Sequence, residues 1–294
     1  DGSAMRRRVI QAIEHFVDVR GMSDEQVAQR IALDGLDILI DLKGYTAHHR
    51  LGIMARRPAP VQATFLGFPG STGGRFMDYI IGDPVVTPLE HSGHFVEKIA
   101  QMPVCYQPND RQRPRPLALS RAEVGLPETA VVLCGFNQAY KISPEVLDVW
   151  CDLLRQLPES VLWLLDWHGQ ARPNLEREIK ARGIALDRVY WAPKVGLAAH
   201  ISRLRLADVF MDTWPYNAHT TCSDALWAGL PVVTYEGQTF ACRVASSLLR
   251  ACGLAELVTS SLKSYCDSVV RLARDPKLRI SLRAKLDGQR ECGP

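Results

Sequence analysis

The sequence predicts an α/β fold with two domains, each built on a parallel sheet. Short apolar runs typical of buried strands alternate with segments of helical period along most of the chain. The 294 residues are enough for two domains of ~150 residues, each able to bury its own core. Residues 107–116 hold three prolines and three arginines but no aliphatic side chain, a composition typical of a linker. We expect a first domain over 1–106, a linker over 107–118 and a second domain over 119–294.

In the first domain, helix and strand signals follow one another closely. Ser23 and Gln26 have the spacing of a capping box, and a helical pattern continues from them to Gly35. Three strands are predicted after this helix, at 36–42, 61–65 and 78–81. Doubly wound domains normally open with a strand, whereas this chain opens with a basic helix over residues 5–14. We therefore expect this domain to be incomplete at its N-terminus.

The second domain shows the alternation more regularly. Its strands are predicted at 131–136, 161–165, 188–191, 208–211 and 231–235. Its helices are predicted from residue 143, at 175–182, at 197–206 and at 220–228. This order is typical of a doubly wound sheet of about five strands, which binds ligands beyond the carboxyl ends of its strands.

Composition and motifs exclude several classes of function. The 35 Lys and Arg against 32 Asp and Glu give a net charge of +3, too small to indicate nucleic acid or an anionic membrane as the main partner. The apolar runs are far shorter than the ~18 residues that span a bilayer. No glycine-rich phosphate loop ending in Lys-Ser/Thr is present, and no Gly-x-Gly-x-x-Gly turn opens a helix, which argues against ATPases and dinucleotide dehydrogenases.

Metal-ligating residue types are scattered along the chain. The eight cysteines are widely spaced without a Cys-x-x-Cys pair, so we interpret them as reduced thiols of a cytoplasmic protein. No Asp-x-Asp pair follows a strand, and no His and Glu cluster has the spacing of metal ligands. We predict no metal and no cofactor, so cationic groups of the chain itself would neutralise any bound diphosphate.

A polar segment follows the first strand of the second domain. Asn137, Gln138 and Lys141 come directly after the run that ends at Phe136. A lysine at that edge of the sheet can reach a phosphate with its ammonium, and the two amides can orient polar groups. The segment predicts a diphosphate site around Lys141. The alternative is that the amides only end the strand and Lys141 is solvated.

A second polar segment opens the helix predicted from residue 220. His219, Thr220 and Thr221 stand at its first turn, where free backbone N–H groups and the helix dipole favour an anion. Asp224 follows on the same face, within reach of sugar hydroxyls. These residues predict a seat for phosphate and sugar. The alternative is a threonine-capped helix with an ordinary first-turn aspartate.

Two further pairs are candidates with less specific signals. His200 and Arg203 share a face of the helix predicted at 197–206, where they could stack on a nucleobase, although a histidine beside an apolar stripe is also commonly structural. Tyr45 and Arg50 follow a strand end in the first domain and could line a cleft between the domains. The alternative for this pair is a tight turn with surface arginines.

The ordered segments together resemble the catalytic region of the O-linked N-acetylglucosamine transferases, in particular a bacterial member of that family. The similar segments are 34–46, 57–62, 66–70, 76–81, 136–141, 160–165, 206–208, 219–221 and 226–229. The resemblance implies a GT-B fold, in which two Rossmann-like domains face a cleft. It also implies metal-independent, inverting transfer of N-acetylglucosamine from UDP-N-acetylglucosamine to Ser or Thr hydroxyls of proteins.

The resemblance implies a role for each candidate residue. Lys141 and Gln138 would contact the diphosphate, and Lys141 would stabilise the charge that develops on it. His219, Thr220 and Thr221 would lie at the phosphates and the sugar. The other assignments are uracil for His200 and Arg203, ribose for Asp224, and the sugar and acceptor side for Tyr45, Arg50, Leu66 and Gly67. Lys141, His219 and Asp224 are thus the candidate catalytic residues, and Asn137 is grouped with the substrate-binding ones.

The chain departs from the family pattern in three ways. The upstream segment with the family's candidate catalytic histidines is absent, and so are the helical repeats that recruit protein substrates; we expect both upstream in the full-length protein. The long insertion of animal members is absent too, which favours a bacterial origin. The alternatives are a UDP- or GDP-sugar binding lobe that is inactive without its upstream segment, and a related protein fucosyltransferase or asparagine glucosyltransferase.

Overall fold

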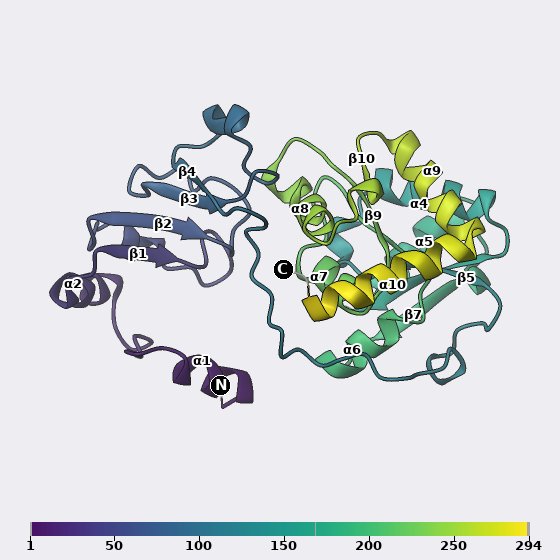
Figure 1. Ribbon diagram of the computed structural model, residues 1–294, viewed down its shortest axis with the longest axis horizontal. Helices are drawn as coiled ribbons and strands as arrows, with labels where there is room; N and C mark the ends of the chain where they lie inside the picture. Colours follow the sequence, from purple (N-terminus) through teal and green to yellow (C-terminus); the bar gives the residue numbers. More distant parts are fainter. Residues whose placement is uncertain (1, 168, 293–294) are drawn as a thin grey trace. The chain divides into compact units, whose positions relative to one another are not determined.

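The computed structural model describes residues 2–167 and 169–292, which divide into two compact units (Figure 1). The first unit takes the chain up to Ile81 together with Gly93–Ala100, and the second takes Gly82–Ser92 and the chain from Gln101 onward. Residues 82–92 and 101–106, which the sequence analysis placed in the first domain, therefore lie with the second unit.

A buried aspartate explains why these segments join the second unit. The Oδ1 atom of Asp83 accepts hydrogen bonds from the backbone N–H groups of Val85 and Val86 at 2.8 and 2.9 Å. Its Oδ2 atom accepts from the Tyr106 N–H at 2.8 Å and from the Ser247 hydroxyl at 2.6 Å. A buried carboxylate needs such partners, so Asp83 ties both segments to the helix that carries Ser247.

The first unit is a four-stranded sheet in the order β1-β2-β3-β4, with β1, β2 and β3 parallel. The strands are β1 (Ile38–Asp41), β2 (Val61–Phe65), β3 (Tyr79–Gly82) and β4 (Lys98–Gln101). The helices are α1 (Ala4–Gln11), α2 (Asp24–Asp34) and α3 (Leu51–Met54), while the 3-10 segment η1 (Leu89–His94) has residues 89–92 in the second unit and 93–94 in the first. The predicted capping box is confirmed, since Ser23 and Gln26 bond each other reciprocally and Gly35 ends α2 at φ 66°. Strand β4 was not predicted, because its half-polar sequence lacks a clear period.

The second unit is a six-stranded sheet in the order β10-β9-β8-β5-β6-β7, and every adjacent pair is parallel. The strands are β5 (Val131–Gly135), β6 (Ser160–Asp166), β7 (Val189–Pro193), β8 (Val209–Met211), β9 (Val232–Tyr235) and β10 (Val258–Thr259). The α-helices are α4 (Pro144–Gln156), α5 (Ala171–Ala181), α6 (Leu197–Leu204), α7 (Thr220–Trp227), α8 (Val244–Ala251), α9 (Leu262–Arg274) and α10 (Pro276–Cys292). The 3-10 segments are η2 (Ala122–Val124), η3 (Ala139–Lys141), η4 (Leu186–Arg188), η5 (Phe240–Cys242) and η6 (Ala255–Leu257).

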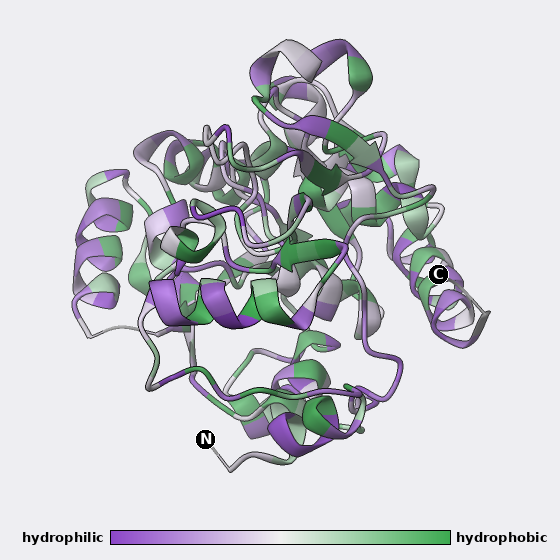
Figure 2. Cartoon of the chain, turned by 90° about the vertical axis from the view of Figure 1, so that its left-hand side faces the viewer, coloured by the Kyte–Doolittle hydropathy of each residue, from purple (hydrophilic) through white to green (hydrophobic). Residues whose placement is uncertain are grey.

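The strand pattern of the second unit agrees with the sequence prediction in all five expected strands. The sixth, β10, has only two residues, too few to show a period. Helix α5 begins at Ala171, four residues before the predicted start at residue 175. Figure 2 shows purple and green along the same helices, as expected for elements with one face on a sheet.

Large aromatic side chains fill the core of the second unit. Trp150, Trp163, Phe136 and Tyr265 are all almost completely buried. Gly135, at the end of β5, leaves room for the Trp150 ring: a Cβ atom there would lie 2.6 Å from the ring. The packing of the Trp150 ring therefore fixes the carboxyl end of β5. The candidate site residues begin directly after this strand end.

The order of the strands reverses between β5 and β8. From β5 the chain moves outward through β6 and β7, and it then returns to the other side of β5 and moves outward through β8, β9 and β10. Open α/β sheets bind ligands at such a switch point, beyond the carboxyl ends of the two central strands. Both polar segments of the second unit, after β5 and after β8, begin there.

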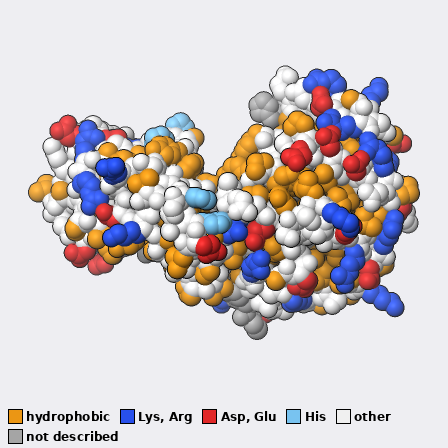
Figure 3. Space-filling view, turned by 90° about the horizontal axis from the view of Figure 1, so that it is seen from above, with side chains coloured by type: hydrophobic (Ala, Val, Ile, Leu, Met, Phe, Trp, Pro, Cys, Tyr) orange, Lys and Arg blue, Asp and Glu red, His pale blue; other side chains and the backbone are white. Residues whose placement is uncertain are grey.

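Three further observations concern membrane-spanning helices, surface charge and cysteines. No helix among the described residues is long and apolar enough to cross a membrane. Positive and negative side chains are interspersed on the face shown in Figure 3. Seven of the eight cysteines, at positions 105, 134, 151, 222, 242, 252 and 266, are free thiols, and four of these seven are buried.

Gly135→Ala should lower the stability of the second unit by about 1–3 kcal/mol, because the added methyl group has no space beside the Trp150 ring. Gly288→Ala is the matched control, since a Cβ there meets nothing within 4 Å and alanine favours the helix interior. Urea unfolding followed by fluorescence measures the free energy of unfolding of both variants. Equal stability of the two variants would contradict the packing argument.

Candidate active site

The loops after β5 and β8 are held together at the switch point by one buried amide. The Nδ2 group of Asn137 donates to the Thr213 hydroxyl at 2.8 Å and to Asp212 Oδ1 at 3.2 Å. Its Oδ1 atom accepts a hydrogen bond from the Thr221 hydroxyl at 2.9 Å. Both ends of the amide are thus used inside the protein. These bonds are those of a positioning residue, and the predicted contact of Asn137 with substrate stays a prediction.

The Asp212 carboxylate lies completely buried beneath the site. Its Oδ1 atom accepts from the backbone N–H groups of Thr213 and Ala218 at 2.8 and 2.6 Å, and its Oδ2 atom accepts from the Thr234 hydroxyl at 2.6 Å. Burial raises its pKa to about 6, against the opposing effect of these hydrogen bonds and of Lys141. Asp212 was not among the predicted site residues, although an aspartate directly after a buried strand was a usable signal.

Lys141 stands above this carboxylate at the end of η3. Its ammonium donates to the Asn217 carbonyl at 2.7 Å and lies 3.9 Å from the centre of the Tyr216 ring. Burial lowers its pKa to about 8, and the charge of Asp212 opposes that shift. The group therefore stays protonated at neutral pH, partly desolvated, with donors left for a ligand. The alternative of a merely solvated Lys141 disagrees with these contacts.

The first turn of α7 offers backbone donors beside Lys141. Thr220 and Thr221 open the helix, no acidic residue lies in this turn, and no side chain caps it. Its free N–H groups and the helix dipole suit an anion. The adjacent His219 is held by a contact of 3.2 Å between its Nε2 atom and the Ala241 carbonyl. Because a carbonyl only accepts, Nε2 carries the proton, and burial lowers the pKa of His219 to about 3.

A cavity of about 280 Å³ extends from Thr221 and Asp224 to the ends of β6 and β7. His200 and Arg203 of α6 line it together, as their spacing predicted. The ring of His200 stacks on Phe136, and the guanidinium of Arg203 lies 5.0 Å from the centre of the same ring. These contacts give the cavity a planar, partly cationic wall that suits an aromatic base.

Arg203 and His200 also fix one another. Arg203 donates to the Pro193 carbonyl at 2.5 Å and, through Nη2, to His200 Nδ1 at 3.1 Å. A guanidinium only donates, so His200 carries its proton on Nε2, and burial lowers its pKa to about 4. Arg203 is 5% exposed, and its Nε group has no partner among the described residues. This Nε group is thus a buried donor that the described residues leave unsatisfied.

Sequence reasoning missed the apolar wall opposite. Leu165, Trp167, Val195 and Leu197 line the cavity, and they come from the end of β6, the loops after β6 and β7, and the start of α6. The Lys194 ammonium lies 4.6 Å from the centre of the Trp167 ring. The usable signal was topological, because parallel strands place all these loops at one edge of the sheet. Gln138, a predicted ligand residue, lines the same cavity.

Asp224 borders the cavity and is 7% exposed. One of its oxygens accepts a hydrogen bond from Arg113 at 3.1 Å. Burial raises its pKa, and the charge and hydrogen bond of Arg113 oppose that shift. Arg113 lies in the predicted linker and was not among the candidate residues, because the linker was expected not to pack.

In the first unit the candidate residues are largely engaged by their own surroundings. The Arg50 guanidinium bonds Asp24 at 2.7 Å and the carbonyls of Val19 and Met22 at 3.1 and 2.7 Å. It therefore anchors the segment before α2, and the structure contradicts the exposed surface arginine of the alternative interpretation. These three bonds leave two of the five guanidinium N–H groups, and the predicted place of Arg50 at the sugar and acceptor side stays a prediction.

The turn after β2 brings Tyr45 and Gly67 near the same strand end. The Tyr45 hydroxyl donates to the Thr72 carbonyl at 2.8 Å, and its ring packs edge-on against Phe68. Leu66 has a φ of 70°, and a Cβ at Gly67 would lie 2.2 Å from the Leu42 carbonyl oxygen. The backbone of this turn thus passes too close to β1 for any side chain at Gly67.

Two α/β units, each built on a largely parallel sheet, with a polar site at the switch point of the second, agree with the architecture of the GT-B glycosyltransferases. The chain belongs to glycosyl transferase family 41, whose sequence model matches residues 1–116 and 109–294. This confirms the fold and the family that the sequence resemblance implied.

Relatives and solved structures agree with this assignment. The chain is 38% identical over 287 residues to the probable UDP-N-acetylglucosamine–peptide N-acetylglucosaminyltransferase SEC of Arabidopsis thaliana, covering 95% of the chain and 29% of that protein. It is 29% identical to the corresponding enzyme of Caenorhabditis elegans, covering 97% of the chain and 35% of that protein. The chain thus spans about a third of the length of these relatives.

Two solved structures have the same fold. A Thermobaculum terrenum O-GlcNAc transferase mutant superimposes with a TM-score of 0.92 at 33% identity, covering 99% of the chain and 55% of that protein. The sucrose-phosphate synthase of Thermosynechococcus elongatus superimposes with a TM-score of 0.65 at 14% identity, covering 96% of the chain and 77% of that protein, and shows the fold alone.

Asn137→Ala should lower the stability of the second unit by about 1–3 kcal/mol, because it leaves the Thr221 hydroxyl without its acceptor and separates two loops. Asn174→Ala, which removes one exposed contact to Arg177, should change stability by less than about 0.5 kcal/mol. Thermal and urea unfolding of both variants measure this. An Asn137 variant as stable as the unmodified chain would mean that the amide serves a ligand instead.

Proposed function

We propose that this chain is the donor-binding and catalytic part of an enzyme that transfers N-acetylglucosamine from UDP-N-acetylglucosamine to Ser or Thr hydroxyls of proteins. Family 41 membership supports the class of reaction, and the names of the relatives in Arabidopsis and Caenorhabditis support the donor and a peptide acceptor. The observation that carries the proposal is the position of the buried Lys141 ammonium beside the open first turn of α7, next to a cavity of nucleoside size.

Each part of the donor has a complementary surface in the second unit. The base would lie in the cavity, in contact with His200, Arg203 and Trp167, which line it. The ribose hydroxyls would meet Asp224, and the diphosphate would lie between Lys141 and the first turn of α7. Gln138 and Thr220 would add side-chain donors along this path, as the family resemblance implied, and Thr221, whose hydroxyl donates to Asn137, would add its backbone N–H.

In the proposed reaction the acceptor oxygen attacks C1 of the sugar from the face opposite the diphosphate. The C1–O bond to the β-phosphate breaks, its electron pair leaves with UDP, and the hydroxyl proton is lost from the acceptor oxygen. Negative charge develops on the β-phosphate, and fixed donors that already face this position stabilise it most in the transition state. Lys141 and the α7 N–H groups supply this stabilisation, so the proposed transfer is independent of a metal ion.

His200 and His219 suit a different task from proton removal. Burial lowers the pKa of His200 to about 4 and that of His219 to about 3, so both are neutral and weak bases near pH 7. His219 can orient a phosphate or sugar group without adding charge. In this proposal the second unit therefore holds the donor and stabilises the leaving group.

The wider setting is part of the same proposal. Free thiols on seven of the eight cysteines support a reducing compartment such as the cytoplasm. Similarity to the Thermobaculum terrenum enzyme supports a bacterial origin. Helical repeats upstream, a protein acceptor and the absence of a cofactor are likewise inferred from the family pattern.

Isothermal titration should show binding of UDP and UDP-N-acetylglucosamine in preference to GDP. Lys141→Met should weaken UDP binding about tenfold to a hundredfold, the usual effect of losing a hydrogen bond to a charged group. Lys263→Met, at an exposed lysine of α9, is the control and should leave UDP affinity unchanged. Preference for GDP would favour a fucosyltransferase, and tight UDP binding without transfer to peptides would favour a donor-binding lobe.

UDP affinity should fall as the pH rises above about 8, because the Lys141 ammonium, whose pKa burial lowers to about 8, then loses its proton. Lys141→Arg keeps its charge throughout and should remove this fall. Isothermal titration of UDP at several pH values between about 7 and 9.5 measures this fall in affinity. An identical alkaline fall in the arginine variant would assign the titration to another group.

EDTA should leave transfer by the complete enzyme unchanged if Lys141 and α7 neutralise the diphosphate as proposed. The measurement is transfer of labelled N-acetylglucosamine to a peptide with and without the chelator. A loss of activity that magnesium restores would show that a divalent ion takes part.

A further inference from the structure

The segment 107–117, predicted as an unpacked linker, is ordered against the second unit, and we call it the strap. Asn109 accepts a hydrogen bond from the Ser223 hydroxyl at 2.5 Å, and the Pro114 carbonyl accepts one from the Trp227 indole at 2.8 Å. The N–H of Leu117 donates to the Ser202 hydroxyl at 3.0 Å. The strap therefore follows α7 and reaches α6, the two helices that border the donor cavity.

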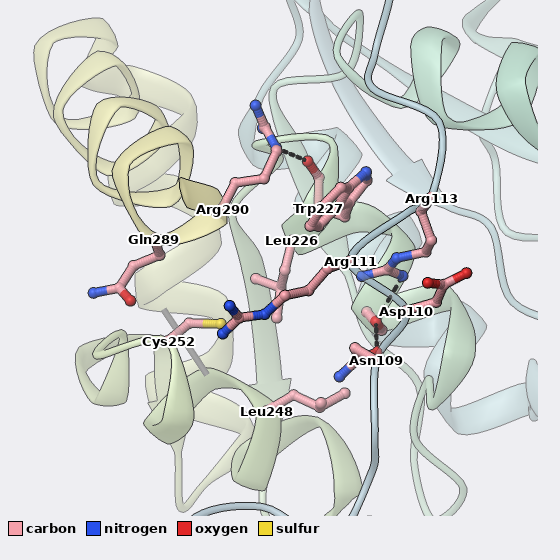
Figure 4. Close-up of a pocket in the computed structure, with 11 residues that line it drawn as sticks. Asn109, Asp110, Arg111, Arg113, Leu226, Trp227, Leu248, Cys252, Gln289 and Arg290 are labelled. Carbon is pink, nitrogen blue, oxygen red and sulfur yellow. Dashed lines mark hydrogen bonds between the residues drawn. The ribbon is translucent and has the colours of Figure 1, made fainter. Parts of the chain in front are cut away.

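Arg113 is a largely buried charged side chain among these contacts. Its guanidinium lies 4.7 Å from the centre of the Trp227 ring, and its Nη1 group donates to the Ser223 hydroxyl at 2.9 Å and to Asp224 Oδ1 at 3.1 Å. The side chains of Arg113 and Asp224 are only 13% and 10% exposed. Figure 4 shows Arg113 beside Trp227 at the edge of a second, small cavity on this side of α7.

The Asp224 carboxylate faces two ways. Oδ1 is bound by the strap, while the residue also lines the donor cavity. Among the contacts of the described residues, Oδ2 has no hydrogen bond. An aspartate with one oxygen fixed by arginine and the other open to a cavity is oriented to accept a hydrogen bond from a ligand hydroxyl.

We propose that Arg113 is a positioning residue for donor recognition, which holds the Asp224 carboxylate so that its second oxygen accepts a hydrogen bond from a ribose hydroxyl. This inference rests on the proposed function of the donor cavity and adds to it a residue outside the sheet and its loops. The strap is then a wall of the nucleotide site, and selection of ribose depends on it.

The electrostatics around Asp224 explain why a cation is needed there. Burial raises the pKa of Asp224, and Arg113 opposes that shift. Other titratable groups around this position include Asp110 of the strap, the neutral thiols of Cys222 and Cys252 and, across the cavity, the neutral His200 and the Arg203 of α6. The Arg203 guanidinium is already bound to Pro193 and His200. Arg113 is thus the cation in direct contact with the carboxylate.

The test compares UDP with 2′,3′-dideoxy-UDP, which lacks both ribose hydroxyls, by isothermal titration into the full chain. Arg113→Met keeps a long side chain over Trp227 but removes the charge and the donors. It should weaken UDP binding about tenfold and leave dideoxy-UDP binding within about twofold, as expected for a lost hydrogen bond to a charged group. Asp224→Asn should show the same pattern, and Arg113→Lys should recover part of the UDP affinity.

Arg115→Met is the matched control, because Arg115 lies in the same strap and forms an exposed ion pair with Glu291 at 2.6 Å. It should leave both affinities unchanged. Equal weakening of UDP and dideoxy-UDP by Arg113→Met would mean that Arg113 only supports the fold of the site, and no weakening of either would mean that Asp224 needs no partner. Either result overturns the proposal.

The same titrations separate this inference from the proposed function. Failure of the unmodified chain to bind UDP would contradict the donor site itself. UDP binding that depends on Lys141 and Asp224 but not on Arg113 would leave the donor site intact and remove only the role of the strap.

Discussion

The site depends on a single buried carboxylate, that of Asp212 at the end of β8. Burial of an ionised group is costly unless hydrogen bonds and an opposite charge compensate for it. Here two backbone N–H groups, the Thr234 hydroxyl and the Asn137 amide supply the hydrogen bonds, and Lys141 supplies the charge. The requirement to satisfy this carboxylate fixes the loop after β8, the loop after β5 and the start of α7 in one arrangement. The ligand-facing groups are placed as a consequence.

This arrangement concentrates positive charge where a diphosphate would lie and keeps the neighbouring histidines neutral. The burial that lowers the pKa of Lys141 to about 8 also lowers those of His219 and His200. A lysine tolerates such a shift and remains charged at neutral pH, whereas a histidine does not. Partial desolvation also strengthens the attraction between the remaining ammonium and an anion. The same physical effect thus separates the cation of the site from its neutral hydrogen-bonding groups.

The sequence was sufficient to predict the doubly wound sheet and the two polar loops, because alternating apolar runs and strand-end residues are local signals. It predicted correctly that His200 and Arg203 lie together, since helical spacing places them on one face. The internal bonds of Asn137 were not predicted, because residue type and position do not show whether an amide is used internally. The strap was predicted to be unpacked because prolines and arginines cannot form an apolar core. It is ordered by other means, through carbonyl acceptors and through a guanidinium that stacks on Trp227.

One donor beside the cavity stays unsatisfied in the folded chain. The Nε group of Arg203 is buried without a partner among the described residues, and such a group costs about 1–3 kcal/mol when left unsatisfied. Its other donors are committed to Pro193 and His200, so the guanidinium cannot turn to relieve the cost without breaking both contacts. The Nε atom is shielded from the cavity in this state, so a ligand acceptor would reach it only after a local movement of the surrounding side chains. The cost of this unsatisfied donor is therefore already present in the folded state, and a ligand that reached the donor would recover it.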